Sequence, residues 1–175
     1  MKDSRNVVDK YKGLPVEDIV SDLDAHGVEL EIAVENLSRD FNMGTIIRSA
    51  NAFGVRHVHI IGSRQWNKRG AMMTDKYLHV HYYATIDDFI QANPDKKVLA
   101  IDNVAGSVNL SASHLPQHAI LVFGSEGDGL SAELLSKAEG IISIEQIGST
   151  RSLNVGVAAG IVMYEWLRQH KLTRQ

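Results

Sequence analysis

The sequence contains no cysteine and no long apolar run. The lack of cysteine excludes a disulfide scaffold, a thiolate metal site and a cysteine nucleophile. No apolar stretch approaches the roughly 20 residues that span a bilayer. The first 13 residues are polar and mixed in charge, unlike the apolar core of a signal peptide. We therefore expect a cytoplasmic protein without a membrane span.

The sequence also lacks an excess of positive charge, since it contains 18 lysines and arginines but 21 aspartates and glutamates. The net charge of −3 argues against tight, indiscriminate nucleic-acid binding but leaves room for a local basic patch. Hydrophobic residues make up 44% and charged residues 22% of the chain, which is typical of a globular protein. At about 100–200 residues per domain, the length of 175 residues predicts a single domain.

Strand and helix patterns alternate along the chain. Residues 28–34 alternate apolar with other side chains at the period of a strand, and the apolar segment 119–124 predicts a fully buried strand. Further strands are expected at 55–62, 98–102 and 141–145, and helices at 15–26, 44–53, 86–93, 131–140 and 154–170. This alternation predicts an α/β fold with a mostly parallel sheet flanked by helices. We interpret residues 1–27 as an N-terminal arm and helix, and residues 28–175 as the main domain.

A glycine-rich turn at 124–129 follows the most apolar strand and precedes a helix that Ser131 can cap. Glycines let backbone amides approach a ligand closely, and open α/β sheets bind ligands at the carboxyl ends of their strands. The order G-x-x-G-x-G differs from the G-x-G-x-x-G of dinucleotide-binding turns, and no phosphate-loop lysine follows. Taken alone, the turn is equally compatible with a structural connection.

Two further segments place polar residues at helix starts. Asn42 lies where an N-cap is expected, and Arg48 follows among small and apolar neighbours, where a guanidinium requires an anion or solvent. Ser152 or Asn154 can cap the last helix, whose first turns are rich in glycine and alanine. In isolation, these segments also fit a snorkelling arginine and a closely packed helix.

In order and spacing, the three segments together resemble the three motifs of the SpoU (TrmH) family of RNA ribose 2′-O-methyltransferases, within the SPOUT superfamily. The resemblance covers about residues 28–170. The motifs are carried by Asn36, Asn42, Gly44 and Arg48, by Gly124, Glu126, Gly127 and Gly129, and by Ser152, Leu153 and Asn154. The sequence departs from the family pattern at Arg39–Asp40, at Glu145–Gln146 and at Gly156, where Asp-Pro, an Ile-Pro-like pair and serine are common.

The resemblance implies S-adenosylmethionine as cofactor, a C-terminal trefoil knot and a homodimer. It assigns catalysis to Arg48, with Asn42, Glu126, Ser152 and Asn154 shaping the site. Because arginine does not lose its proton in proteins, we interpret Arg48 as a cation that anchors a phosphate and stabilises developing negative charge. The resemblance places the cofactor on Asp102, Asn103, Phe123, Gly124, Ser125, Glu126, Gly127, Ile144, Ile147, Ser152, Leu153 and Asn154, largely through backbone groups.

A basic cluster around an aromatic ring follows the strand at 55–62. Arg64, Lys68 and Arg69 surround Trp66, and cations for phosphates with a ring for stacking are typical of single-stranded RNA recognition. We also expect Arg39 to bind RNA, and Arg5, Lys10 and Lys12 of the arm to extend this surface. Because only about 27 residues precede the first predicted strand, the arm, the cluster and a second subunit are expected to recognise the RNA, with tRNA slightly favoured over rRNA.

Two histidine pairs, at 57 and 59 and at 79 and 81, each place both rings on one face of a strand. No nearby acid completes a set of three ligands, so we expect no metal. Two other functions stay open. One is a non-catalytic RNA-binding protein of the same fold, and the other is a nucleotide-dependent α/β oxidoreductase, which the glycine order disfavours.

Overall fold

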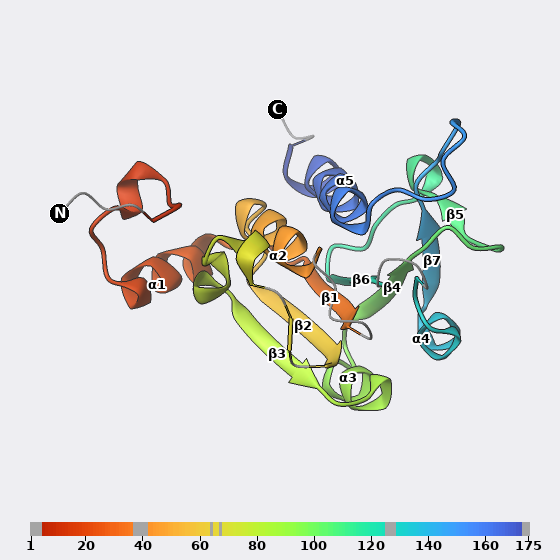
Figure 1. Cartoon of the computed structure of the whole chain (residues 1–175), viewed down its shortest axis with the longest axis horizontal. Coiled ribbons are helices and arrows are strands. Elements are labelled where there is room, and N and C mark those ends of the chain that lie inside the picture. The colour runs from red at the N-terminus through yellow and green to blue at the C-terminus, as the bar shows by residue number, and fades with distance from the viewer. Residues whose placement is uncertain (1–4, 37–41, 64, 67, 125–128, 173–175) are drawn as a thin grey trace.

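The computed structural model describes residues 5–36, 42–63, 65–66, 68–124 and 129–172 (Figure 1). These residues form a sheet of seven strands in the order β3-β2-β1-β6-β4-β7-β5, and each pair of neighbours is parallel. The strands are β1 (Glu31–Asn36), β2 (His57–Gly62), β3 (His79–Tyr83), β4 (Lys97–Ile101), β5 (Val108–Asn109), β6 (Ala119–Phe123) and β7 (Gly140–Ser143). The predicted parallel α/β sheet is confirmed.

Helices cover both faces of the sheet. The α-helices are α1 (Val16–His26), α2 (Met43–Ala52), α3 (Ile86–Ala92), α4 (Ala132–Lys137) and α5 (Val155–Leu167). Figure 1 shows α2 and α5 on one face and α3 and α4 on the other. Short 3-10 turns lie at Asp9–Tyr11, Arg69–Ala71, Thr74–Tyr77 and Leu110–Ala112, and a π-helical turn at Arg168–Leu172 follows α5.

The central strand β6 shows why the sheet needs both layers of helices. Leu121 and Phe123 are buried in the core that includes side chains of α2 and α5, and Ile120 and Val122 are buried in the core that includes α3 and α4. Parallel strands buried on both faces carry continuous apolar runs. The run at 119–123 therefore positions the centre of the sheet.

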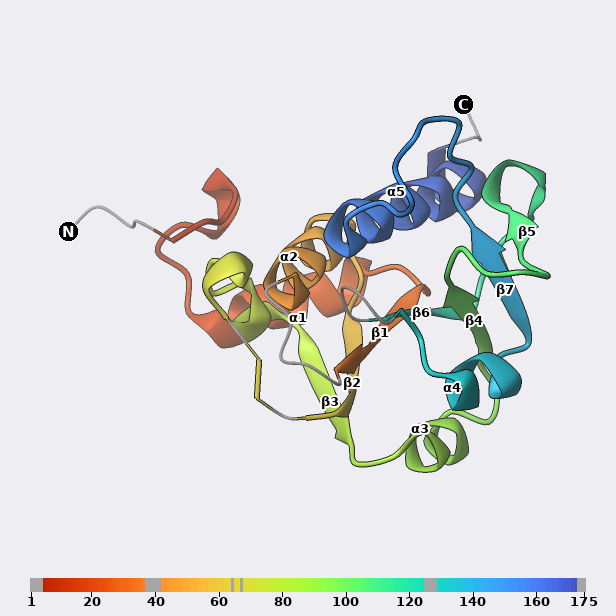
Figure 2. The ribbon, with the colours of Figure 1, turned by 45° about the vertical axis from the view of Figure 1, so that its right-hand side comes forward.

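The last helix is fastened to the segment that precedes β6. Gln169 donates to the carbonyl of Ser113 at 3.1 Å and accepts from the amide of Leu115 at 2.9 Å. The Trp166 indole is buried and donates to the carbonyl of Pro116 at 2.9 Å. Figure 2 shows α5 lying alongside α2 over the sheet. These contacts fix α5 next to the strand ends that build the site.

The described part of the N-terminal arm is docked on the domain. Tyr11 is buried with Ile19 of α1 and with Tyr77, and its hydroxyl donates to the Asp22 carboxylate at 2.5 Å. Arg5 donates to the Tyr11 carbonyl at 3.3 Å. The polar composition of residues 1–13 did not reveal this anchoring, because Tyr11 is the only buried residue among residues 5–13. The division of the chain at residue 27 stays a prediction.

One prediction of local structure is wrong, and the predicted strands include neither β3 nor β5. Gly140 opens β7 instead of ending the preceding helix, which stops at Lys137. Strand β5 was not predicted, because Val108 and Asn109 are both exposed and show no apolar alternation. Among the described residues, no helix is long and apolar enough to cross a membrane.

Candidate active site

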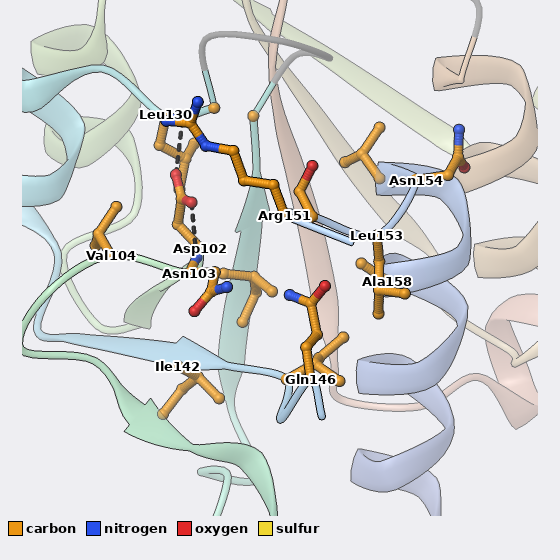
Figure 3. Close-up of a pocket in the computed structure, with 16 residues that line it drawn as sticks. Asp102, Asn103, Val104, Leu130, Ile142, Gln146, Arg151, Leu153, Asn154 and Ala158 are labelled. Carbon is orange, nitrogen blue, oxygen red and sulfur yellow. Dashed lines mark hydrogen bonds between the residues drawn. The ribbon is translucent and has the colours of Figure 1, made fainter. Parts of the chain in front are cut away.

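A cavity of about 760 Å³ opens beside the carboxyl ends of β4, β6 and β7 (Figure 3). Cavities of about 300–1,000 Å³ bind small organic ligands and cofactors. Seven residues that the resemblance assigns to the cofactor line it: Asp102, Asn103, Gly124, Ile144, Ser152, Leu153 and Asn154. The structure thus brings together segments that lie up to 52 residues apart in the chain, from Asp102 to Asn154.

Asp102 fixes the described end of the glycine turn. Its carboxylate accepts from the Asn103 amide at 2.7 Å and from the Leu130 amide at 3.0 Å, as the dashed lines in Figure 3 show. Gly129 has φ +68°, and a Cβ there would lie 2.7 Å from the Asp102 carboxylate. A Cβ on Gly124 would lie 2.3 Å from the Gly129 carbonyl. Both glycines are therefore required by close approach within the turn.

Asn42 and Asn154 join the starts of α2 and α5; we call this pair the cap junction. The Asn154 side-chain oxygen accepts from the amides of Gly156 at 3.0 Å and Val157 at 3.2 Å, which confirms the predicted cap of the last helix. Its amide nitrogen donates to the Asn42 side-chain oxygen at 2.9 Å.

This contact changes the role expected of Asn42. The residue occupies the N-cap position of α2, but no capping bond from its side chain is found within the part of the chain that the structure describes. Its oxygen is instead engaged by Asn154. Because a helix N-terminus carries roughly half a positive charge, the cap junction brings two such ends together at the edge of the cavity. This edge favours a negatively charged group.

Arg48 lies six residues beyond Asn42 on α2, and its side chain is exposed. At about 1.5 Å per residue, this places it about 9 Å farther along the helix axis. Neither Arg48 nor Asn42 belongs to the described lining of the cavity. The structure therefore connects the first motif to the cavity through the cap junction, and it leaves Arg48 accessible to a large substrate.

Other predicted residues lie elsewhere. The structure does not bring Phe123 or Ile147 into the described lining: Phe123 is buried in the core beneath Gly124, and Ile147 is fully exposed because its loop turns the side chain outward. Of the third motif and its loop, Ser152 and Leu153 do face the cavity. Ser125, Glu126 and Gly127 lie outside the described residues, as do Arg39 and Arg64.

Among the lining residues that were not predicted from the sequence, Gln146 and Arg151 are the two with polar side chains. Figure 3 shows the Arg151 side chain extending toward Leu130 and Asp102. Both residues belong to the loop that leads to Ser152, but a loop has no periodicity from which the direction of a side chain can be predicted. Their position adds a cation and an amide to the cavity.

Glu145, where the family commonly has an Ile-Pro-like pair, tethers the same loop. Its carboxylate accepts from the Ser111 hydroxyl and from the Ser111 amide, the latter at 3.2 Å. The hydrogen bond from the hydroxyl holds the pKa of Glu145 below its usual range. The loop at 144–153 is therefore attached to the segment after β5 at the position where the family pattern differs.

The predicted basic cluster is only partly directed at solvent. Trp66 is partly buried against the main core, and Lys68 lies 5.3 Å from the centre of its ring. Lys68 also pairs with Asp75 at 2.9 Å, and this hydrogen bond raises the pKa of Lys68. Arg69 is exposed. The RNA contact of this cluster stays a prediction.

The four histidines form a continuous stack, which we call the histidine stack, on the face of the sheet that carries α3. Ring centres are 5.1–5.3 Å apart along His79, His57, His81 and His59. Each ring has a protein partner: His57 contacts His81 at 3.0 Å, His59 contacts Glu31 at 2.7 Å and His79 contacts Asp24 at 2.9 Å. The described residues contain no group of three acids or histidines arranged to hold a metal.

A cavity at the carboxyl edge of a parallel sheet, bordered by a glycine turn and two helix starts, defines an α/β protein that binds an organic ligand at that edge. Residues 29–164 match the SpoU rRNA Methylase family. Since this match covers most of the chain, the protein belongs to the SpoU rRNA methylase family.

Individual relatives agree with this assignment. Over 148 residues the chain is 29% identical to the tRNA (guanosine(18)-2′-O)-methyltransferase of Escherichia coli strain K12, covering 82% of this chain and 65% of that protein. The chain thus spans slightly less than two thirds of that relative's length.

Two solved structures share the fold. An AdoMet-bound rRNA methyltransferase from Sinorhizobium meliloti has a TM-score of 0.71 and 27% identity, covering 81% of this chain and 56% of that one. The second structure is described as giving structural insights into the 2-OH methylation of C/U34 on tRNA. It has a TM-score of 0.72 and 25% identity, and the match covers 83% of this chain and 97% of that one.

Proposed function

We propose that the protein transfers a methyl group from S-adenosylmethionine to a ribose 2′-hydroxyl of RNA, with tRNA favoured as the substrate. The observation that carries this proposal is the meeting of the three family motifs at one cavity. Residues of the second and third motifs line it, and Asn42 of the first is hydrogen-bonded to Asn154. The names of the relatives, which include a tRNA 2′-O-methyltransferase and an AdoMet-bound enzyme, support the same activity.

The chemistry of the cavity suits this cofactor. Val104, Ile142 and Ile144 offer an apolar surface for a purine ring. Asp102, Asn103 and Arg151 add a carboxylate, an amide and a cation, which match ribose hydroxyls and an amino-acid end that carries both charges. We assign cofactor binding to these residues, to Gly124, Ser152 and Leu153, and to the backbone of the loops at 122–127 and 144–153.

When bound, the cofactor supplies an electrophilic methyl carbon on a sulfonium, so that an oxygen–carbon bond forms as the carbon–sulfur bond breaks and a neutral thioether leaves. The chain must orient the 2′-hydroxyl, let its proton pass to water, and stabilise the negative charge that the oxygen gains as the proton leaves. The cap junction provides partial positive charge from two helix starts. Arg48 provides a full positive charge from the same helix as Asn42, and it anchors the phosphate next to the target ribose. We expect Ser152, Asn154 and Glu126 to shape the site around the 2′-hydroxyl.

A homodimer belongs to this proposal. Val157, Ile161 and Tyr164 of α5 are 53%, 39% and 52% exposed, although all three are large and apolar or aromatic. Their spacing of four and three residues places them on one face of the helix. We assign this face to a two-fold interface. Ile161→Arg should then convert a dimer into a monomer by light scattering, whereas a wild-type chain that is monomeric at micromolar concentration and still active would contradict the dimer.

The C-terminal knot is a further part of the proposal. Membership of the SpoU rRNA methylase family supports it. Knotted chains are rare, so this part depends on the family resemblance.

The activity can be tested in cells and in solution. Mapping of 2′-O-methyl positions in total RNA should show at least one position missing in a deletion strain compared with its parent. S-adenosylmethionine and its demethylated product should raise the melting temperature, since a ligand at 100 times its Kd stabilises the native state by about 2.7 kcal/mol. An unchanged methylation map, with stabilisation by NAD alone, would favour the oxidoreductase instead.

A further inference from the structure

Met72 and Met73 combine two unfavourable features at one place. Their φ angles are +49° and +62°, and among the described residues they alone are non-glycine residues with positive φ. The two residues are also 52% and 55% exposed, at the rim of a small pocket that they share with Arg5 and Asn6 of the arm. A left-handed backbone is disfavoured for a long side chain. An exposed apolar side chain also lacks the favourable free energy that burial of its surface would provide.

The surroundings hold this conformation in place. We call residues 68–77 the methionine loop. The Thr74 hydroxyl donates to the Ala71 carbonyl at 2.6 Å, and both residues are buried. The Lys68–Asp75 ion pair at 2.9 Å connects the two halves of the loop. Backbone strain persists where the surrounding structure over-determines it, and such positions cluster at ligand clamps and active sites.

The methionine loop is also packed directly on the helix that leads to the site. A Cβ on Gly44 would lie 2.7 Å from the Ala71 amide and 2.8 Å from the Gly70 Cα, so the two backbones are in contact. Gly44 follows Asn42 by two residues, and Asn42 is bonded to Asn154 at the cavity. The loop is therefore connected to the cavity edge through short, rigid contacts.

The charge of the loop indicates what it contacts. The loop contains three basic residues, Lys68, Arg69 and Lys76, and one acidic residue, Asp75. Its net charge is therefore 3 − 1 = +2, in a chain whose net charge is −3. Cations beside exposed apolar side chains match the phosphates and base faces of unpaired nucleotides. Methionine sulfur makes favourable contacts with aromatic rings. A continuous duplex hides its base faces and offers no such contact.

We propose that Met72 and Met73 pack against unpaired bases next to the methylated nucleotide, so that the methionine loop selects looped or single-stranded RNA over duplex RNA. This inference rests on the proposed function, because it concerns the substrate of the same site. It assigns a specificity-determining contact to two residues outside the three family motifs.

The test compares three double variants with the wild type. Met72→Ala with Met73→Ala removes the contact, Met72→Leu with Met73→Leu keeps apolar area, and Met72→Gly with Met73→Gly removes the contact and relieves the backbone. Val108→Ala is the matched control, because Val108 is 50% exposed on β5 at the opposite edge of the sheet. Methyl transfer is measured on unmodified tRNA transcripts and on a fully paired RNA duplex, with cofactor affinity by calorimetry and the melting temperature of each variant.

The alanine variant should raise KM for the transcripts about tenfold, with kcat, cofactor affinity and the salt dependence of binding unchanged. The leucine variant and the control should stay within about twofold of the wild type, since they keep the apolar contact. The glycine variant should match the alanine variant in KM and melt at a higher temperature than the wild type, because glycine adopts positive φ without strain.

A KM for the alanine variant within twofold of the wild type overturns the proposal, and so does an equal rise in KM in the leucine variant. Transfer by the wild type to the duplex with the same KM as to the transcripts overturns it as well. An unchanged KM together with a lower mass by light scattering assigns the loop to a protein contact and likewise overturns it. If the wild type transfers no methyl group to any RNA, the proposed function itself fails. This result differs from failure of the loop proposal, in which the wild type is active and the alanine variant keeps its KM.

Discussion

The cap junction and the histidine stack are two polar constructions on opposite faces of the same sheet, and they differ in what their groups contact. In the histidine stack, each ring is paired with a neighbour on an adjacent element, such as His59 with Glu31 or His79 with Asp24. In the cap junction, one asparagine pair holds two helix starts at the edge of a cavity of about 760 Å³.

This difference separates a structural cluster from a functional one. The regular spacing of the histidines suggests a functional site in the sequence, but in the structure their hydrogen bonds are made to other groups of the protein. The asparagines are 112 residues apart, and they join two positive helix ends at the edge of a space that a ligand can enter. We therefore expect changes at the cap junction and its helix to affect methyl transfer, and changes in the histidine stack to affect stability.

The largest expected effect is at Arg48. Arg48→Ala should lower the single-turnover rate of methyl transfer by about 10²–10³, since removal of one charge-stabilising group commonly costs about 2.7–4 kcal/mol. Cofactor affinity by calorimetry should be unchanged, because Arg48 lies outside the described lining of the cavity. Arg48→Lys should recover little, because a point charge does not replace a bidentate guanidinium. A near-normal rate in Arg48→Ala would remove the catalytic role of α2.

The next effect separates the two functions of Asn154. Asn154→Ala removes the cap of α5 and the contact to Asn42, so it should lower the free energy of unfolding by about 1 kcal/mol and weaken both cofactor binding and turnover. Asn154→Asp keeps an acceptor for the helix amides but has no donor for Asn42. This variant should restore the melting temperature without restoring turnover. Equal turnover in Asn154→Asp and the wild type would show that methyl transfer does not need the amide donor of Asn154.

A smaller effect concerns the basic cluster. Neutralising Arg64, Lys68 and Arg69 together should weaken RNA binding and flatten its salt dependence, by a slope of roughly 0.7–0.9 for each phosphate that the protein no longer neutralises. Lys68 should contribute least, because Asp75 already neutralises much of its charge. Titrations at several salt concentrations measure the slope, and calorimetry with the cofactor serves as the control. An unaltered slope would mean that the cluster is a solvated loop.

The smallest effect is expected in the histidine stack. Burial holds the pKa values of His57 and His81 below the ordinary 6.5. The unfolded chain therefore binds more protons just below pH 6.5, so stability should fall as the pH decreases through this range. The decrease should stay below about 1 kcal/mol, because both rings are partly exposed and water screens their charges.

Glu31 defines a second, separate pH range. Although its burial opposes the shift, contacts with His59 and Lys96 lower the pKa of Glu31 to about 2. The stability that it contributes is present above about pH 4.5 and is lost toward pH 2. Thermal melts from pH 8 to pH 2 resolve the two ranges, and His81→Gln should flatten only the upper one. A change in methyl-transfer rate in His81→Gln at pH 7.5 would contradict the structural role of the stack.

The sequence predicted the sheet because its strands are apolar or regularly alternating. Segment 119–124 is recognisable as β6, and the cap by Asn154 follows from its place before a run of small residues. Strand β5 could not be predicted, since its two residues are exposed and its pairing with β7 depends on tertiary structure. Strand β3 was not among the predicted strands, although the two-residue spacing of His79 and His81 places both rings on one face of a strand.

Within the site, the features that local sequence patterns could not predict are contacts between residues that lie far apart in the chain. The contact between Asn42 and Asn154 has no local signal, and a capping role was the better local prediction for Asn42. Whether a loop side chain enters the cavity, as Arg151 does, or points to solvent, as Ile147 does, depends on how the loop is tethered. Glu145 provides such a tether through Ser111, a contact that the spacing of the motifs does not reveal.

The most direct test of the account is nucleoside analysis after methyl transfer in solution. The purified chain is incubated with S-adenosylmethionine and unmodified tRNA transcripts, and the RNA is digested to nucleosides and analysed by mass spectrometry. We predict a 2′-O-methylated nucleoside with the wild type and its near absence with Arg48→Ala, while calorimetry shows that both proteins bind the cofactor. A methyl group found on a base, or no transfer by a wild type that binds no S-adenosylmethionine, would contradict the account.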